Sequence, residues 1–204
     1  MLASGGKACL KIHPRIGTER LRLRPYVSDD AAELARHGGD AAIADTMLDW
    51  PHPFSAANAR STIAAQAASY QAGRAVHFVV ERREEPGLVG GVELAELDDR
   101  HRRGALRFWI AKTHWDQRYA REAAGAVLRF GFEELDLHRI DAMRLVRCPR
   151  AAAVLRAIGM REEGVLRERV RVGGRWEDVA LAAALHGDAA SVAASPPALE
   201  APGP

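Results

Sequence analysis

The chain has 204 residues and a formal net charge of +2, and hydrophobic residues make up 48% of it. This length and apolar content predict one globular domain with a core. The small net charge demands neither nucleic acid nor an anionic membrane as a partner, and two cysteines, Cys9 and Cys148, are too few for a disulfide framework or a zinc cluster. No apolar run would span a bilayer and the N-terminus lacks the core of a signal peptide, so a cytoplasmic location is expected.

Three segments of the chain differ in composition. Residues 1–15 carry no periodic pattern and are expected to form a flexible N-terminal arm. Residues 16–186 alternate between helix-like and strand-like patterns and are expected to form the domain. Residues 187–204 are rich in Ala, Pro, Gly and Ser without an apolar face, which predicts a disordered tail.

The first half of the domain is predicted to hold one short strand and two helices. Leucine and arginine alternate over residues 21–24, a period of two that is typical of a strand. Capping serines at one end and glycines at the other bound two helices, over residues 28–39 and 55–73. The Pro-rich stretch between the helices, residues 49–55, is expected to be irregular.

The second half of the domain alternates strands with helices. Strands are predicted where apolar residues recur with a period of two, and helices where the period is close to 3.6. A Gly-Gly pair between the last two strands supplies the left-handed backbone that a tight hairpin needs. The predicted strands cover residues 76–80, 88–97, 106–110, 140–146, 165–172 and 175–185, and the predicted helices cover residues 119–135 and 149–159.

This order contains one crossover unit, formed by the strand at 106–110, the helix at 119–135 and the strand at 140–146. A connection through a helix makes its two strands parallel. The predicted fold class is therefore α/β (α+β), a mixed sheet with a central parallel β-α-β crossover. The start of the crossover helix offers unpaired N–H groups and a positive dipole end, which suits a pyrophosphate, although most strand-to-helix loops bind no ligand.

Seven short motifs occur in an order and spacing that is typical of one enzyme family. They are TERLRLRP, WPHPFS, LVGGVEL, FWIA, HW..RYAREA, LDLHRIDA and LRAIGMREEGVLRERVRVGGRWEDVALAAAL, and they span residues 18–185. On these motifs the chain resembles the GNAT superfamily of N-acetyltransferases, in the branch that acetylates the N-terminal amine of ribosomal proteins. The resemblance implies a mostly antiparallel, twisted sheet flanked by about four helices, and acetyl-CoA as co-substrate.

The resemblance also implies where the cofactor binds. In the family the two crossover strands splay apart, and the pantetheine arm pairs with the backbone of the first strand, here Trp109, Ile110 and Ala111. The pyrophosphate lies on the N–H groups of the following loop, here Asp116, Gln117, Arg118, Tyr119, Ala120 and Arg121. Cys148 ends the next strand and is a further candidate for contact with the cofactor.

The chain departs from the family pattern at several positions. The cofactor loop of the family usually reads Trp-Gly-x-Gly-Tyr-Ala, whereas Asp116 and Arg118 replace both glycines here. Glycine lets the backbone approach phosphate closely, so Arg118 either meets the phosphates directly or blocks the site. Ala105, Cys148 and Ala182 stand where the family favours Glu, Asn and Tyr, so a carboxylate base, a polar cofactor contact and a tyrosine acid are absent.

Three side chains are candidates for roles in acetyl transfer. Cys148 is a candidate proton donor to the leaving CoA thiolate, and its competing interpretation is a small buried filler. Glu93 is a candidate base acting through water, and its competing interpretation is a solvated strand residue. His52 is a candidate for the acceptor side of the site or an ordinary residue of a Pro-rich loop. No histidine has the spacing of a metal site, so no metal is expected.

The predicted reaction is direct attack of a primary amine on the thioester, with no covalent enzyme intermediate. An α-amine has a pKa of about 7.7–8.0 and a lysine about 10.4, so a site without a strong base favours a peptide or protein N-terminal α-amine, or a small amine. The alternatives are a catalytically silent member that binds CoA or a protein partner and acts in regulation, and an enzyme with a different acyl donor. Neither a membrane nor nucleic acid is expected as a partner, and the C-terminal hairpin is a candidate surface for a homodimer.

Overall fold

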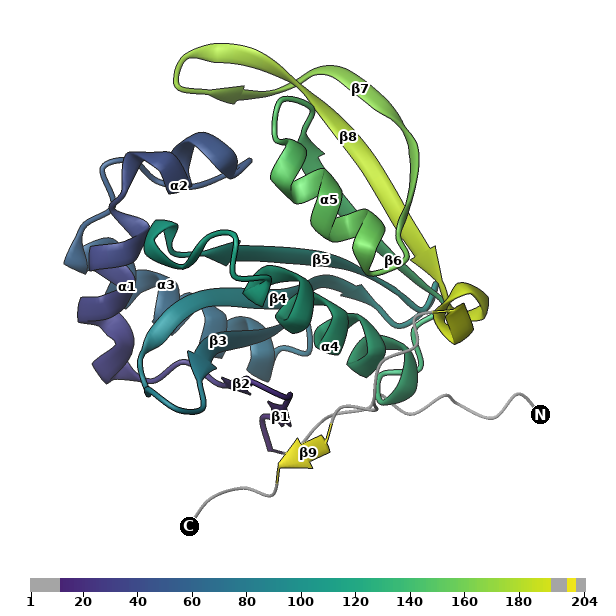
Figure 1. Cartoon of the computed structure of the whole chain (residues 1–204), viewed down its shortest axis with the longest axis horizontal. Coiled ribbons are helices and arrows are strands. Elements are labelled where there is room, and N and C mark those ends of the chain that lie inside the picture. The colour runs from purple at the N-terminus through teal and green to yellow at the C-terminus, as the bar shows by residue number, and fades with distance from the viewer. Residues whose placement is uncertain (1–11, 192–197, 201–204) are drawn as a thin grey trace.

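Nine strands form a single sheet in the computed structural model, which describes residues 12–191 and 198–200 (Figure 1). The sheet order is β7-β8-β6-β5-β4-β3-β2-β1-β9. The strands are β1 (Arg15–Gly17), β2 (Leu21–Arg24), β3 (Val76–Arg82), β4 (Leu88–Asp98), β5 (Arg103–Ile110), β6 (Arg139–Leu145), β7 (Arg161–Val172), β8 (Arg175–Leu185) and β9 (Ala198–Glu200). The helices are α1 (Ala31–Gly38), α2 (Ala41–Thr46), α3 (Ala56–Gln71), α4 (Tyr119–Glu133) and α5 (Pro149–Ala157), with 3-10 turns η1 (Ser28–Asp30), η2 (Lys112–His114) and η3 (His186–Ser191).

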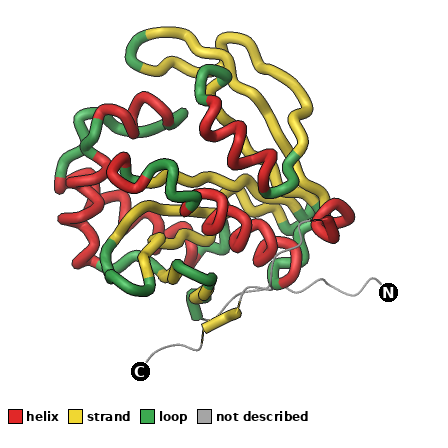
Figure 2. Tube along the Cα trace, viewed as in Figure 1, coloured by secondary structure: helices red, strands yellow, loops and turns green. Residues whose placement is uncertain are grey.

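Helices pack against both faces of the sheet (Figures 1 and 2). On the face that α4 and α5 cover, the buried rings of Phe78 and Phe130 meet edge-on with centroids 5.9 Å apart. On the opposite face, α1 and α3 pack on a second cluster that contains Leu34, Ala59 and Trp109. Both clusters draw on the same strands because successive side chains of a strand point to opposite faces. The predicted fold class is confirmed, since the sheet is mostly antiparallel with β5 and β6 as the parallel pair of the β5-α4-β6 crossover.

The two crossover strands are paired at one end and separate at the other. Their paired residues are Arg103, Gly104 and Ala105 of β5 with Arg139, Ile140 and Asp141 of β6. Beyond Ala105, β5 continues to pair with β4 as far as Ile110, and β6 continues to pair with β8 as far as Leu145. Each strand therefore follows its outer neighbour, and the sheet opens between them.

A pair of glycines in β4 keeps β5 close on that side. A Cβ at Gly90 would lie 2.3 Å from the carbonyl oxygen of Trp109, and a Cβ at Gly91 would lie 2.2 Å from the hydroxyl of Tyr26. Neither separation is sterically possible, so any side chain at these positions would push β5 or Tyr26 away. The close approach of β5 and of Tyr26 to β4 thus explains the two glycines of the LVGGVEL motif.

Helix α2 is a feature that the sequence pattern does not predict. Asp40 caps it by accepting a hydrogen bond from the backbone N–H of Ala42 at 2.9 Å, and Ile43 is its buried residue. Six residues are too few to show a helical stripe. With α2, five helices flank the sheet instead of the expected four or so.

The ordered body extends beyond the predicted boundaries at residues 16 and 186. Arg15 already belongs to β1, and the ring of His13 packs on Tyr70 with centroids 4.4 Å apart. At the other end, residues 187–191 belong to η3 and β9 pairs antiparallel with β1, where the sequence predicts a disordered tail. Backbone pairing at a sheet edge needs no apolar periodicity, which is why the pattern misses it. The rest of the predicted arm and tail lies outside the described residues.

The C-terminal hairpin forms where the Gly-Gly pair predicts it. Gly173 and Gly174 join β7 to β8 with φ of 55° and 83°. The homodimer predicted for this surface stays a prediction. None of the helices within the described ranges is long and apolar enough to cross a membrane, and the cytoplasmic location stays a prediction as well.

Candidate active site

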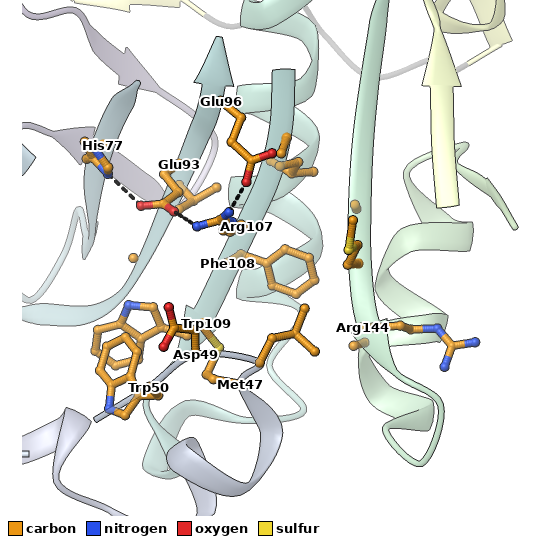
Figure 3. Close-up of a pocket in the computed structure, with 18 of the residues that line it drawn as sticks. Met47, Asp49, Trp50, His77, Glu93, Glu96, Arg107, Phe108, Trp109 and Arg144 are labelled. Carbon is orange, nitrogen blue, oxygen red and sulfur yellow. Dashed lines mark hydrogen bonds and ion pairs between the residues drawn. The ribbon is translucent and has the colours of Figure 1, made fainter. Parts of the chain in front are cut away.

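A cavity of about 670 Å³ lies where β5 and β6 separate (Figure 3). On the side of α4 and α5 its lining includes Leu106 and Leu155, and on the opposite side it includes Glu93 and Trp109. Because residues from both faces of the sheet line one cavity, the cavity passes through the opening in the sheet. A ligand can therefore approach from one face and meet a second ligand that approaches from the other.

Four polar side chains form a chain of contacts along one wall of the cavity (Figure 3). Nδ1 of His77 lies 2.6 Å from a carboxylate oxygen of Glu93, and it must donate because a carboxylate only accepts. The guanidinium of Arg107 lies 3.7 Å from the other oxygen of Glu93 and also pairs with Glu96. These contacts fix the position of the Glu93 carboxylate at the cavity wall.

The second nitrogen of His77 has no such contact. Its Nε2 atom is buried and makes no hydrogen bond with any described residue. With Nδ1 donating to Glu93, Nε2 keeps a lone pair that no described residue contacts.

Aromatic side chains line the same side of the cavity. Trp50 stacks on Phe54 with ring centroids 4.9 Å apart and is 5.4 Å from the ring of Trp109. The indole N–H of Trp109 donates to the hydroxyl of Tyr26. Burial raises the pKa of Tyr26 far above its ordinary value, and the negative charge of Glu93 adds to this effect, so the phenol stays protonated. These rings form a rigid apolar wall beside the charged network.

The loop between β5 and α4 keeps a glycine-like backbone without glycine. Asp116 and Arg118 have φ of 61° and 64°, the left-handed region that side chains rarely occupy. Arg118 is the N-cap of α4, and its exposed side chain forms no ion pair within the described part of the chain. The indole of Trp115 donates to the carbonyl of Ile110 at 2.6 Å and fixes the start of the loop. The loop thus places side chains at two positions whose backbone conformation favours glycine.

Glu122 fastens the first turn of α4 to the loop between β1 and β2. It accepts hydrogen bonds from the hydroxyl of Thr18 at 2.6 Å and from the backbone N–H of Arg20 at 2.8 Å. It also forms an ion pair of 2.7 Å with the guanidinium of Arg20, which lies over the ring of Tyr119. Burial opposes ionisation of Glu122, but these hydrogen bonds and the charge of Arg20 outweigh it and lower its pKa.

The residues predicted to bind the cofactor fall into two groups. Trp109 lines the cavity, whereas residues 116–121 form the loop and first turn at the start of α4, outside the cavity lining. Ile110 at the end of β5 and Ala111 after it do not line the cavity, and two of their backbone groups are already engaged: the Ile110 carbonyl accepts from Trp115 and the Ala111 N–H donates to Val89. The first N–H groups of α4 have no acceptor within the helix, as at any helix start.

Two other predicted site residues lie apart from the cavity. Cys148 is buried in a small cluster with Leu145 and Val179 and is not part of the cavity lining. Burial raises the pKa of its thiol, so it stays protonated, and its position favours the packing interpretation over proton transfer. His52 is exposed and does not line the cavity, although Trp50 and Phe54 beside it do. Glu93 is the candidate that the structure places at the cavity wall.

Several cavity residues have only a weak signal in the sequence. His77 alternates with Val76 and Phe78, which indicates that it faces away from the core of its strand, but nothing local pairs it with Glu93. Tyr26 and Trp50 lie in irregular segments without a period. No group of three or more His, Cys, Asp or Glu side chains in the described ranges has the arrangement of a metal site.

Comparison with known proteins places the chain among acetyltransferases. The family model for the acetyltransferase (GNAT) domain matches residues 20–161. An uncharacterized N-acetyltransferase of Bacillus subtilis, YoaA, is 32% identical over 162 residues, which is 79% of this chain and 90% of the relative. Spermidine N(1)-acetyltransferase of Vibrio cholerae is 35% identical over 102 residues, 50% of this chain and 58% of the relative.

Solved structures give the same picture at the level of the fold. Mycobacterium smegmatis RimJ, in complex with CoA-disulfide, superposes with a TM-score of 0.76 at 25% identity and covers 85% of this chain and 90% of its own. Spermidine N-acetyltransferase from Vibrio cholerae, in complex with CoA and spermine, superposes with a TM-score of 0.75 at 25% identity and covers 85% of this chain and 99% of its own.

The left-handed backbone at Arg118 predicts that a glycine stabilises the protein there. A side chain in this conformation costs the folded state about 1–2 kcal/mol. Glycine removes that cost, but it raises the entropy of the unfolded chain, which lowers stability by about 0.4–1 kcal/mol. We expect Arg118→Gly to raise the free energy of unfolding by roughly 0.5–1 kcal/mol in urea titrations. Arg121→Gly, in the helical first turn of the same helix, is the matched control and should lower it by about 1 kcal/mol. Equal losses in both variants would contradict this view of the loop.

The Glu122 contacts predict a pH-dependent contribution to stability. Because the folded pKa is below the unfolded value of about 4.3, the contribution is present above that pH and is lost as pH falls through the folded pKa. Glu122→Gln should lower the free energy of unfolding by about 1–3 kcal/mol at neutral pH. The difference from the parent should shrink in acid, below about pH 4. Urea unfolding at both pH values measures it, with exposed Glu134→Gln as control. A difference that is the same at both pH values would contradict the assignment.

Proposed function

The chain belongs to the GNAT family of acetyltransferases, and on that premise we propose that it acetylates a primary amine of low pKa, either the N-terminal α-amine of a peptide or protein or a small amine. Acetyl-CoA is its co-substrate. The observation that carries the proposal is the cavity through the sheet, which connects the carboxylate of Glu93 on one face with the opening between β5 and β6. The amine is proposed to enter from the Glu93 side.

The loop at the start of α4 fits the phosphates of acetyl-CoA. Its backbone keeps the left-handed turns at residues 116 and 118, and the free N–H groups of the helix start favour an anion. When bound, acetyl-CoA supplies the thioester: its carbonyl carbon forms the new bond to nitrogen, the carbon–sulfur bond breaks, and the sulfur leaves as a thiolate. Trp109 and Phe108 line the cavity beside the end of β5, and we propose that they exclude water from the reacting atoms.

Glu93 is proposed to take the proton that the attacking amine gives up, through a water molecule. The N–H of His77 and the guanidinium of Arg107 hold its carboxylate in a fixed direction. An ordinary carboxylate is a weak base, so this arrangement suits an amine that is already partly neutral. At pH 7 an α-amine needs about 3–4 kcal/mol less deprotonation work than a lysine side chain.

The absence of the family's tyrosine acid at Ala182 is compatible with this reaction. Ala182 is buried in the core and offers no proton. A thiol has a pKa of about 8.5, so the thiolate of CoA is a good leaving group and can take its proton from water after the carbon–sulfur bond breaks. Protonated Tyr26 is the phenol that lines the cavity, on the acceptor side next to Trp109.

The acceptor class is tested with two peptides of one sequence and the purified protein. One peptide has a free N-terminus and an acetylated lysine, and the other has an acetylated N-terminus and a free lysine. We expect faster acetylation of the free N-terminus near neutral pH, measured as CoA release. Faster acetylation of the lysine would overturn the α-amine proposal. Calorimetric binding of acetyl-CoA without turnover of any amine, small ones included, would instead favour a catalytically silent, regulatory protein.

Glu93→Gln tests the proposed base. Loss of a positioned proton acceptor typically lowers the rate on the order of a hundredfold, so we expect a comparable fall in kcat with the preferred acceptor. The Kd for acetyl-CoA should stay unchanged in calorimetry, because Glu93 lies on the acceptor side. Glu85→Gln, an exposed carboxylate between β3 and β4, is the control. An unchanged kcat in Glu93→Gln would remove this residue from the mechanism.

A further inference from the structure

An ion pair spans the open end of the gap between β5 and β6. Asp116 lies in the loop that follows β5, and Arg150 lies in the first turn of α5, which follows β6. A guanidinium nitrogen of Arg150 is 3.3 Å from a carboxylate oxygen of Asp116. The same guanidinium lies over the indole of Trp115, 4.8 Å from the ring centre. The two elements that border the opening are thus joined by one arginine.

The position of Asp116 makes this contact unusual. Its carboxylate belongs to the loop at the start of α4, where the helix dipole and the free N–H groups attract a phosphate. A negative side chain there repels a phosphate unless a cation neutralises it. Arg150 is that cation, so the charge that replaces the family's glycine is balanced by a residue on the opposite side of the opening.

The ion pair is also weak enough to be exchanged. The side chain of Arg150 is 64% exposed and that of Asp116 is 72% exposed. Exposed ion pairs contribute little to stability, whereas a guanidinium binds phosphate through two parallel hydrogen bonds. A phosphate that arrives at the loop therefore competes well for Arg150. Stacking on Trp115 keeps the guanidinium at the opening whichever anion it contacts.

We propose that Arg150 is a phosphate-binding residue for acetyl-CoA, and that Asp116 holds it across the opening until a phosphate of the cofactor takes the place of the carboxylate. Asp116 then acts as an internal competitor that lowers the affinity for the cofactor. The inference rests on acetyl-CoA as co-substrate and does not depend on which amine is the acceptor.

Calorimetry with the full chain and acetyl-CoA, at fixed ionic strength and without acceptor, tests the proposal. Arg150→Gln should raise the Kd about tenfold, the size of a lost hydrogen bond to a charged group. Arg156→Gln, which removes the same charge from the last turn of the same helix, should leave the Kd within a factor of about two. Asp116→Asn should tighten binding roughly two- to fivefold, because the competing charge is removed.

Two further arms identify the contact. The tightening of acetyl-CoA binding by Asp116→Asn should be smaller in the Arg150→Gln background, because the carboxylate then has no guanidinium to hold.

A series of ligands identifies the phosphate that Arg150 contacts. Acetyl-dephospho-CoA lacks the 3′-phosphate and acetyl-pantetheine lacks every phosphate. If Arg150 contacts the pyrophosphate, its loss weakens acetyl-dephospho-CoA as much as acetyl-CoA, and if it contacts the 3′-phosphate, the loss affects acetyl-CoA alone. In both cases acetyl-pantetheine should bind Arg150→Gln and the parent equally.

Three results would overturn the proposal. They are unchanged affinity of Arg150→Gln for acetyl-CoA, an equal loss in Arg156→Gln, and an equal loss of acetyl-pantetheine, which would mean a structural defect. Urea unfolding of each variant checks that the fold is intact. Failure of the parent protein itself to bind acetyl-CoA is a distinct outcome, since it would overturn the co-substrate along with the role of Arg150.

Discussion

The separation of β5 from β6 is the constraint on which the rest of the structure depends. After three paired residues, β5 follows β4 and β6 follows β8, and the backbone between them is no longer satisfied by a neighbouring strand. The glycines of β4 reinforce this by letting Trp109 approach closely on one side. In a continuous sheet, the side chains of one face would be separated from those of the other by the backbone of the strands. The opening instead lets one cavity collect side chains from both.

The charges on the two sides of the opening are arranged differently, as the proposed roles require. On the acceptor side Glu93 is held by His77 and Arg107 in a partly buried network, which keeps its carboxylate in one position. On the cofactor side Asp116 and Arg150 are exposed and weakly paired, so their contact exchanges readily. The first arrangement suits a group that must stay in one place during a reaction, and the second suits a site that must admit a large anion.

The backbone at the start of α4 is strained, and the surrounding contacts hold it in place. Two residues with side chains occupy left-handed backbone, which costs free energy that glycine would not. Glu122 offsets part of that cost by tying the first turn to Thr18 and Arg20. The loop thereby holds a backbone shape that favours glycine although Asp116 and Arg118 occupy it.

By itself the sequence determined the order and type of most elements, because core-facing residues recur with the period of a strand or a helix. It also located the loop at the start of α4, since a motif is a local property, and it offered Glu93, His52 and Cys148 as candidate site residues. It missed α2 and β9, which are too short to show a period, and it could not tell that Glu93 lines the cavity whereas His52 and Cys148 do not. Only the tertiary structure brought His77 to Glu93, 16 residues away, and Arg150 to Asp116, 34 residues away. Such pairs depend on the strand register and on where the sheet opens, and the spacing of residues along the chain determines neither of these.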